Sequence, residues 1–282
     1  MTRCFTIHQT AMPFEPQASE SPALIGPPQV GARERFNSIY SVVSSSPTYW
    51  NIHRDVYGAE YPEEAAPYSF VTRGDLQRIA AGVALPRRQT LVDVGCGQGG
   101  PGMWVARETG ALLTGIDVSP VAVAQAATRA AAFGLGGRAR FQIGEFAATG
   151  LPGSAFDAVM SVDVLWVAPD KPAALREIAR ILRPNSRFVF TTWDFGSSPP
   201  DEPQPTDHRP LLREAGFAVE AYEPDQTFEV HFPALLERYE AQRSALVKEL
   251  GEERTERILG HYRRRLALFP GWQRILVVAR LG

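Results

Sequence analysis

The chain has 282 residues, of which 44% are hydrophobic, enough to form one α/β domain with additional helices. Its 29 basic and 31 acidic residues give a formal net charge of −2, so no extended positive field for nucleic acid is expected. Two cysteines, Cys4 and Cys96, are too few for a disulfide framework or a cysteine zinc site.

Signals for export or membrane insertion are missing from this sequence. The first part of the chain lacks a basic start followed by an apolar core, and no apolar run approaches the ~18 residues of a membrane span. No group of His, Cys, Asp and Glu has metal-ligand spacing. We therefore expect a cytoplasmic protein with no metal site and no membrane partner.

The N-terminal part divides into a tail and a helical segment. Residues 1–32 are rich in Pro, Gln, Ser and Gly without periodicity, which predicts a disordered tail. Apolar spacing over 36–58 and 75–84 predicts short amphipathic helices, so residues 33–86 are expected to form an N-terminal helical cap. If a homo-oligomer forms, we expect these helices to pair between chains.

The core, residues 87–282, alternates between strands and helices. Strands are predicted over 90–94, 111–116, 140–143, 155–162 and 187–193, and helices over 101–110, 119–133 and 171–182. After a loop over 197–207 come a short helix, a strand over 217–222, helical periodicity over 232–268, and a last strand over 275–279. This pattern predicts an α/β fold: a doubly wound, Rossmann-like, seven-stranded, mostly parallel sheet. A helical insertion at about 230–270, before the last strand, should form a lid beside the carboxyl edge.

A glycine cluster follows the first core strand, in the segment Leu-Val-Asp-Val-Gly-Cys-Gly-Gln-Gly-Gly over residues 91–100. Glycines allow a sharp turn and close approach of a ligand, and the following helix N-terminus attracts an anionic group. Gly95, Gly97 and Gly100 also satisfy the dinucleotide fingerprint, so a nicotinamide-dependent oxidoreductase is one alternative.

Two acidic residues favour S-adenosylmethionine (SAM) over a dinucleotide. Asp93, two residues before the first glycine, would repel a pyrophosphate but attract the positively charged amino group of SAM. Asp117, at the end of the second core strand, is placed to accept hydrogen bonds from both ribose hydroxyls. SAM is therefore the expected cofactor.

From about Phe70 to Trp193, the sequence resembles the class I SAM-dependent methyltransferase superfamily, including bacterial enzymes that tailor natural products. The resemblance implies that residues 92–99 hold the methionine part of SAM, Asp117 the ribose, and Val118 the adenine. Gly144-Glu145-Phe146 is similar to the segment near the adenine amino group, with Glu where Asp is more usual. The expected cofactor-binding residues are Asp93, Gly95, Cys96, Gly97, Gly99, Asp117, Val118, Gly144, Glu145, Phe146 and Ser161.

After the fourth core strand the sequence reads Ser-Val-Asp-Val-Leu-Trp over residues 161–166. It lacks the Asn/Asp-Pro-Pro-Tyr/Phe sequence found in methyltransferases of DNA base amino groups, which disfavours that activity. Small-molecule relatives often carry a histidine near the position of Trp166, and its absence here argues against simple histidine-base O-methylation.

Methyl transfer needs orientation, and a base where the nucleophile must lose a proton. Asp163 ends the fourth strand and could contact SAM or accept a proton, with a helix N-cap as the alternative. The candidate catalytic residues are Asp163, His208 and His231. The candidate substrate-binding residues are the aromatics Tyr49, Trp50, Trp166 and Trp193, with core packing as the alternative role.

Together these features predict a SAM-dependent methyltransferase acting on a small lipophilic acceptor in secondary metabolism, such as antibiotic biosynthesis. Carbon methylation of an isoprenoid or indole-type scaffold is favoured over oxygen or nitrogen methylation. A SAM-binding cyclase or other non-methylating homologue is a further alternative, because function resides in the site and not in the fold.

Overall fold

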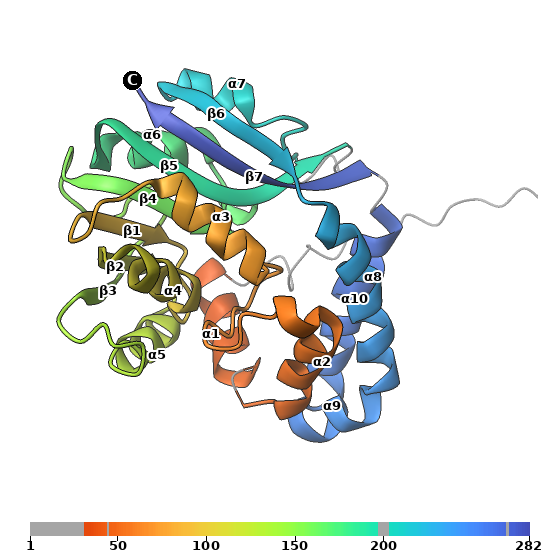
Figure 1. Cartoon of the computed structure of the whole chain (residues 1–282). Helices are drawn as coiled ribbons and strands as arrows, with labels where there is room; N and C mark the ends of the chain where they lie inside the picture. Colours follow the sequence, from red (N-terminus) through yellow and green to blue (C-terminus); the bar gives the residue numbers. More distant parts are fainter. Residues whose placement is uncertain (1–30, 44, 197–202, 269–270) are drawn as a thin grey trace, which may run out of the picture.

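The computed structural model describes residues 31–43, 45–196, 203–268 and 271–282 (Figure 1). Apart from its last two positions, the tail predicted over 1–32 lies outside the described residues, as does part of the loop predicted over 197–207. No helix in the described ranges is both long enough and apolar enough to span a membrane.

Seven strands form one sheet in the order β3-β2-β1-β4-β5-β7-β6. They are β1 (Thr90–Val94), β2 (Leu112–Asp117), β3 (Ala139–Ile143), β4 (Phe156–Val162), β5 (Leu182–Phe195), β6 (Phe217–Pro224) and β7 (Trp272–Leu281). Strands β1 to β5 are parallel, whereas β7 lies antiparallel between β5 and β6. The predicted Rossmann-like, mostly parallel sheet is confirmed.

Helices cover both faces of the sheet because its strands are apolar on both sides. Successive β1 residues point to opposite faces: Leu91 joins one buried cluster and Val92 the other. Helices α3 (Arg73–Val83), α4 (Gly100–Thr109) and α5 (Pro120–Arg129) cover the first face, and α6 (Lys171–Ile181) and α7 (Arg209–Glu214) the second (Figure 1).

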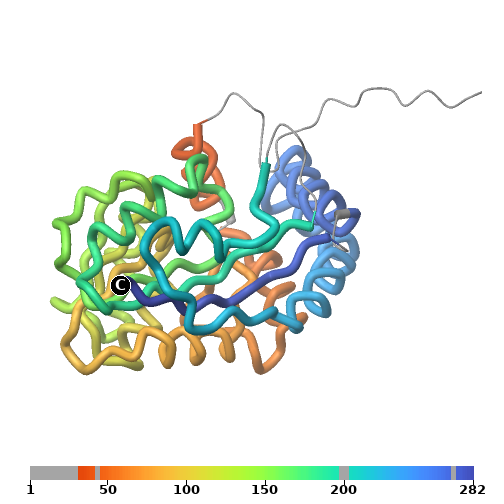
Figure 2. Tube along the Cα trace, turned by 90° about the horizontal axis from the view of Figure 1, so that it is seen from above, coloured from red at the N-terminus to blue at the C-terminus, as the bar shows by residue number. Residues whose placement is uncertain are grey.

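A separate group of helices lies beside the carboxyl ends of β4 and β5 (Figures 1 and 2). We call this group, α2 (Pro47–Tyr57), α8 (Gln226–Ala241), α9 (Arg243–Leu250) and α10 (Glu252–Leu268), the cap. Its interior is a third hydrophobic cluster that includes Trp166, Trp193 and Phe195 from the sheet side. The predicted insertion before the last strand is thus observed as α8 to α10. Helix α1 (Ala32–Val43) packs against α5.

Local sequence signals explain several element boundaries. Ser119 accepts a hydrogen bond from the Ala122 N–H and caps α5, as the Ser-Pro pair predicts. Asn185, within β5, has a φ of +63°, a left-handed conformation that asparagine tolerates, and it lies where the register between β4 and β5 shifts. The periodicity over 232–268 divides into three helices because the chain breaks at Gln242 and at Gly251, whose φ is +84°.

Two short 3-10 helices, η1 (Gly58–Glu60) and η2 (Leu165–Val167), follow α2 and β4. Helix α3 lies within the N-terminal segment predicted as a cap, but it packs on the sheet through Leu76, Ile79 and Val83. Of that segment, α2 contributes to the cap interior through Tyr49, Ile52 and Tyr57.

Candidate functional site

The glycine loop connects β1 to α4 and crosses the carboxyl end of β2. The N–H groups of Gly95 and Cys96 both donate to the Ile116 carbonyl, at 2.8 and 2.9 Å. Gly97 has a φ of +52°, and a Cβ added there would lie 2.4 Å from the Tyr40 hydroxyl. The loop therefore needs glycine both for its backbone conformation and for its contact with α1.

Asp117 fixes this loop from the end of β2. Its Oδ2 accepts the Gly97 N–H at 2.8 Å, and its Oδ1 accepts the Ser119 N–H at 2.9 Å. The carboxyl is 7% exposed, and burial raises its pKa above the ordinary value. Asp117 thus lies where the sequence predicted it, at the carboxyl edge beside the glycine loop.

Asp93 is the most unusual polar group in the site. It is 1% exposed, and within the described part of the chain neither carboxylate oxygen has a hydrogen-bond partner of normal geometry. Its carboxylate lies against Gly102 of α4, where an added Cβ would come within 2.4 Å of Oδ2. Burial, reinforced by the nearby Asp117 charge and partly opposed by the neighbouring Gly102 N–H, raises the pKa of Asp93 to about 7. A buried carboxylate of this kind is suited to a cationic ligand.

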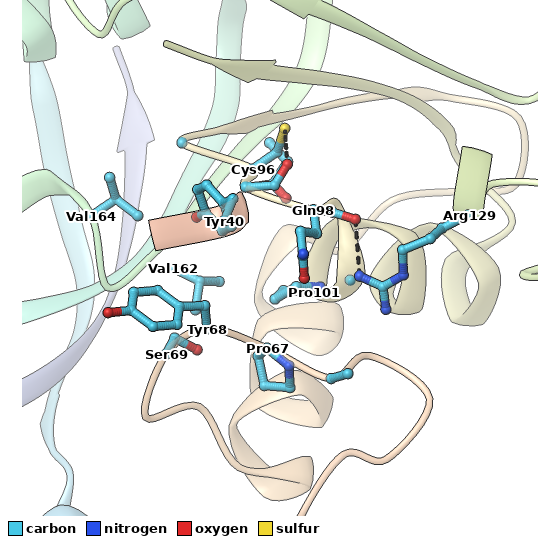
Figure 3. A pocket seen from close by; sticks show the side chains of 15 residues that line it. Tyr40, Pro67, Tyr68, Ser69, Cys96, Gln98, Pro101, Arg129, Val162 and Val164 are labelled. Carbon is cyan, nitrogen blue, oxygen red and sulfur yellow. Dashed lines mark hydrogen bonds between the residues drawn. The ribbon is translucent and has the colours of Figure 1, made fainter. Parts of the chain in front are cut away.

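A cavity opens over the glycine loop (Figure 3). Its empty space of about 400 Å³ includes open solvent at the mouth. The lining residues are Tyr40, Ala66, Pro67, Tyr68, Ser69, Asp93, Gly95, Cys96, Gly97, Gln98, Gly100, Pro101, Arg129, Val162 and Val164. Four of the predicted cofactor-binding residues, Asp93, Gly95, Cys96 and Gly97, are therefore brought together.

Other lining residues were not predicted as part of the cofactor site. Tyr40 comes from α1, Tyr68 from the segment before α3, and Arg129 from the end of α5. The Arg129 guanidinium donates to the carbonyl of Gln98 at 3.0 Å (Figure 3). It also donates to the carbonyl of Ala65 at 2.9 Å, so it joins the glycine loop to the segment before α3. No motif marks these positions, because each lies far from the glycine loop in the chain.

The remaining predicted cofactor residues, Asp117 among them, do not belong to the cavity lining. Gly99 is the N-cap of α4 with a φ of +78°, Val118 is half-buried after β2, and Ser161 is fully buried in β4. The Gly144 N–H donates to the Asp117 carbonyl at 3.1 Å. Glu145 is exposed and the neighbouring Phe146 half-buried. Their predicted contacts with the cofactor stay predictions.

Asp163 lies at the turn after β4 and belongs to a buried ionic network. Its φ is +57°, and its carboxylate accepts hydrogen bonds from the Phe70 N–H at 2.9 Å and the Thr191 hydroxyl at 2.7 Å. Arg274 of β7 donates from Nε to Asp163 at 2.9 Å, and the same guanidinium binds Asp75 and Asp225. Both oxygens of Asp163 are thus occupied.

The network has no counterpart among the sequence predictions. Arg274 is 1% exposed and joins carboxylates from three places: Asp75 of α3, Asp163 after β4, and Asp225, the N-cap of α8. The neighbouring carboxylates raise the pKa of Arg274, and the guanidinium helps to keep the pKa of Asp75 below its usual value despite burial. The guanidinium therefore connects the sheet to α8 of the cap.

His208 lies on the opposite side of the sheet from α3 and α4. It is fully buried; its Nδ1 lies 2.9 Å from Asp194 Oδ1, and its backbone N–H donates to the Tyr222 hydroxyl at 3.0 Å. Its ring packs edge-on to Phe190, in the cluster covered by α6 and α7. The described cavity lining does not include His208.

His231 of α8 has a different environment. Its ring lies 4.3 Å from the ring of Tyr57, and its Nδ1 is buried without a hydrogen-bond partner among the described residues. Burial lowers the pKa of His231, so the imidazole is neutral at pH 7. A neutral imidazole with an unpaired nitrogen can accept a proton.

The predicted substrate-binding aromatics lie in or against the cap. Tyr49, Trp166 and Trp193 are buried members of its hydrophobic cluster, and Trp50 packs against it. The Trp166 indole N–H donates to the Asp163 carbonyl at 2.9 Å, whereas the Trp193 indole N–H has no partner in the described ranges. These side chains make the cap interior mainly aromatic.

Comparison with known proteins identifies the domain. A family model described as a methyltransferase domain matches residues 92–190, from β1 into β5. A probable chloroplastic tocopherol O-methyltransferase of Oryza sativa subsp. japonica is 31% identical over 54% of this chain and 43% of that protein. The 27-O-demethylrifamycin SV methyltransferase of Amycolatopsis mediterranei (strain S699) is 25% identical over 72% of this chain and 81% of that protein.

The chain spans less than half the length of the first curated relatives that it matches. Among solved structures, the cyclase SpnF has a TM-score of 0.71 and 22% sequence identity, covering 90% of this chain and 98% of that chain. The similarity in fold to this structure covers the sheet and most of the described helices.

The residues of the cavity fit the chemistry of SAM. An unpaired buried carboxylate, Asp93, matches the ammonium of the methionine part, and the positive φ of Gly95 and Gly97 leaves the loop backbone open to close approach. A pyrophosphate would face Asp93 with a like charge. The arrangement therefore agrees with SAM and disfavours a dinucleotide.

Proposed function

We propose that this chain is a class I SAM-dependent methyltransferase that methylates a small lipophilic acceptor in secondary metabolism. SAM is its cofactor. The sulfonium of bound SAM supplies an electrophilic methyl group, and the protein's part is to bind, orient and exclude water.

The observation that carries this proposal is the buried, unpaired carboxylate of Asp93 in the lining of a cavity that borders the aromatic cap. Two segments, residues 66–70 and 162–166, contribute both to the cavity lining and to the hydrophobic cluster inside the cap. A cofactor over the glycine loop would therefore lie next to an aromatic surface, which suits an apolar acceptor better than a polyanion.

We favour carbon methylation over oxygen or nitrogen methylation because Asp163 is not free to remove a hydroxyl proton, whereas the proton that a methylated carbon loses needs another acceptor. Asp163 is occupied by Arg274, Thr191 and the Phe70 N–H, so it is better placed to position the cap than to accept a proton. His231 is our candidate for proton acceptance, since its imidazole is neutral and its Nδ1 is unpaired in the described part of the chain.

The first test is calorimetric titration of the purified chain with S-adenosylhomocysteine and, separately, with NADH. We expect micromolar binding of S-adenosylhomocysteine and none of NADH. The reverse result would refute the cofactor assignment. A panel of isoprenoid, indole and phenol acceptors, incubated with SAM and analysed by mass spectrometry, then tests the acceptor class and identifies the methylated atom.

A second candidate is a SAM-binding cyclase that transfers no methyl group. It is supported by the similarity in fold to the cyclase SpnF, which covers 90% of this chain at a TM-score of 0.71. Isotopic labelling separates the two candidates. Methyl-labelled SAM loses its label to product in a methyltransferase, whereas a cyclase yields unlabelled product and leaves SAM intact.

A further inference from the structure

Arg265 of α10 is a buried cation in the cap. Only 2% of the residue is exposed. Its guanidinium carbon lies over the rings of five aromatic side chains, at 4.5 Å from the centroid of Trp193, 4.9 Å from Trp166, 5.0 Å from Trp272, 5.8 Å from Phe70 and 5.9 Å from Phe232. We call these five rings and Arg265 the arginine cage.

The guanidinium has no ion-pair partner in the described ranges, and its Nε and Nη2 make no hydrogen bond there. The nearby carboxylate of Asp163 already binds Arg274 and Thr191. Burial lowers the pKa of Arg265 only to about 10, so it remains charged at pH 7. Aromatic faces offset part of the cost of burying a cation but leave its N–H groups unsatisfied.

The unpaired polar groups of the cage are all donors. Besides the two Arg265 nitrogens, the indole Nε1 of Trp193 is buried without a hydrogen-bond partner in the described chain. The Trp193 ring is also the one nearest to the guanidinium. Three donor nitrogens and one positive charge in otherwise apolar surroundings match an anionic oxygen group.

The cage adjoins the cofactor cavity through two stretches of chain. Tyr68 and Ser69 line the cavity, and the next residue, Phe70, belongs to the cage. Val164 lines the cavity, and Trp166, two residues later, belongs to the cage. Two residues of chain span at most about 7 Å, so the cage lies within the length of a small molecule from the cavity lining.

We propose that Arg265 binds a carboxylate on the methyl acceptor, whose apolar body lies against the aromatic rings of the cage. A planar guanidinium fits the two oxygens of a carboxylate through parallel hydrogen bonds. Because the rest of the cage is uncharged, a singly charged group matches it better than a phosphate or diphosphate. This inference rests on the proposed function and names its acceptor class.

The test uses the full chain saturated with S-adenosylhomocysteine and three probes of equal apolar body: 2-naphthoate, 2-naphthalenemethanol and 2-naphthyl phosphate. Calorimetry measures their affinities for the wild type, Arg265→Met and Arg265→Lys, with Arg254→Met as control. Arg254 is exposed on the same helix. Thermal unfolding of each variant is recorded beside the titrations.

We expect the wild type to bind 2-naphthoate at least tenfold more tightly than the alcohol and more tightly than the phosphate. Arg265→Met should abolish this preference, Arg265→Lys should retain part of it, and Arg254→Met should leave it unchanged. S-adenosylhomocysteine affinity should be equal in all four proteins. We also expect Arg265→Met to unfold at the same or a higher temperature, because an unsatisfied buried charge has been removed.

Equal affinity of the wild type for naphthoate and alcohol, or no binding of either, would overturn the carboxylate assignment. Preference for the phosphate would overturn it also. In each of these cases, retained S-adenosylhomocysteine binding would leave the proposed function standing. Loss of S-adenosylhomocysteine binding in the wild type would instead contradict the proposed function itself.

Discussion

Asp93→Asn replaces the buried carboxylate by a neutral group of nearly the same shape. In the free protein, the pKa of Asp93 is raised to about 7, so the residue is half-ionised near neutral pH. A ligand ammonium requires the ionised form. Cofactor binding should therefore release a proton below pH 7, and affinity should weaken as pH falls.

The magnitude follows from the protonated fraction. At pH 6 about one tenth of the carboxyls are ionised, so S-adenosylhomocysteine should bind about tenfold more weakly than at pH 8, equivalent to about 1.4 kcal/mol. In Asp93→Asn this dependence should disappear, and the affinity at pH 8 should fall by about 2 kcal/mol or more, because a buried charge pair is lost. Asp117, whose pKa burial also raises, is present in both proteins, so any pH dependence of affinity that Asp93→Asn retains is assigned to Asp117.

Whereas cofactor affinity should rise with pH, the free energy of unfolding of the ligand-free protein should fall. A folded-state pKa above the ordinary value means that the folded protein binds the extra proton, so stability is lost as pH rises from about 4 through 7. The difference between 3.8 and about 7 corresponds to roughly 4 kcal/mol as an upper estimate. Without ligand at pH 8, Asp93→Asn should therefore be more stable than the wild type.

The assay is calorimetry at pH 6, 7 and 8 in two buffers of different ionisation enthalpy, which counts released protons, together with urea unfolding without ligand. Affinity that is flat from pH 6 to 8 in the wild type, or equal in Asp93→Asn, would refute the reasoning. Reduced stability of Asp93→Asn at pH 8 would show that the carboxylate has a partner in the folded state.

Four further substitutions test other parts of the structure. Arg274→Met leaves three buried carboxylates without their cation and should lower the free energy of unfolding by about 3–5 kcal/mol, measured in urea. Asp163→Asn should slow turnover roughly tenfold without changing the shape of the pH–rate profile; a loss of about 10²–10⁴-fold together with one limb of the profile would indicate a general base. Gly100→Ala, whose added Cβ would lie 1.8 Å from the Ala65 carbonyl oxygen, should destabilise the fold by about 1–3 kcal/mol in thermal or urea unfolding. His208→Gln should lower stability while leaving kcat/KM unchanged, and a large loss of kcat/KM in a folded variant would assign His208 to catalysis.

The sequence predicted the parallel part of the sheet well because its signals are local. The apolar strand 90–94, the glycine cluster and the Ser119-Pro120 helix start each lie within one short stretch of chain. The same locality explains why Asp93 and Asp117 were found beside the glycine loop. Adjacent parallel strands place their carboxyl ends at one edge, so two strand-end residues must meet there.

The parts that depend on distant contacts were not predictable in this way. Arg274 and its partners Asp75 and Asp225 lie about 50 to 200 positions apart in the chain. The arginine cage likewise joins α10 to rings from β5, β7 and the segment before α3. Cytoplasmic location, absence of nucleic-acid binding and pairing of chains through the N-terminal helices stay predictions.

The position of β7 constrains the order in which the protein can be completed during synthesis. In the sheet, β6 pairs with β7 alone, and Arg274 of β7 supplies the cation for carboxylates that all precede it in the chain. While the ribosome still holds β7, the emerging chain has five parallel strands able to associate, but α8 lacks its ionic tie to them. The cap is therefore anchored to the sheet only after the glycine loop has been translated and can fold.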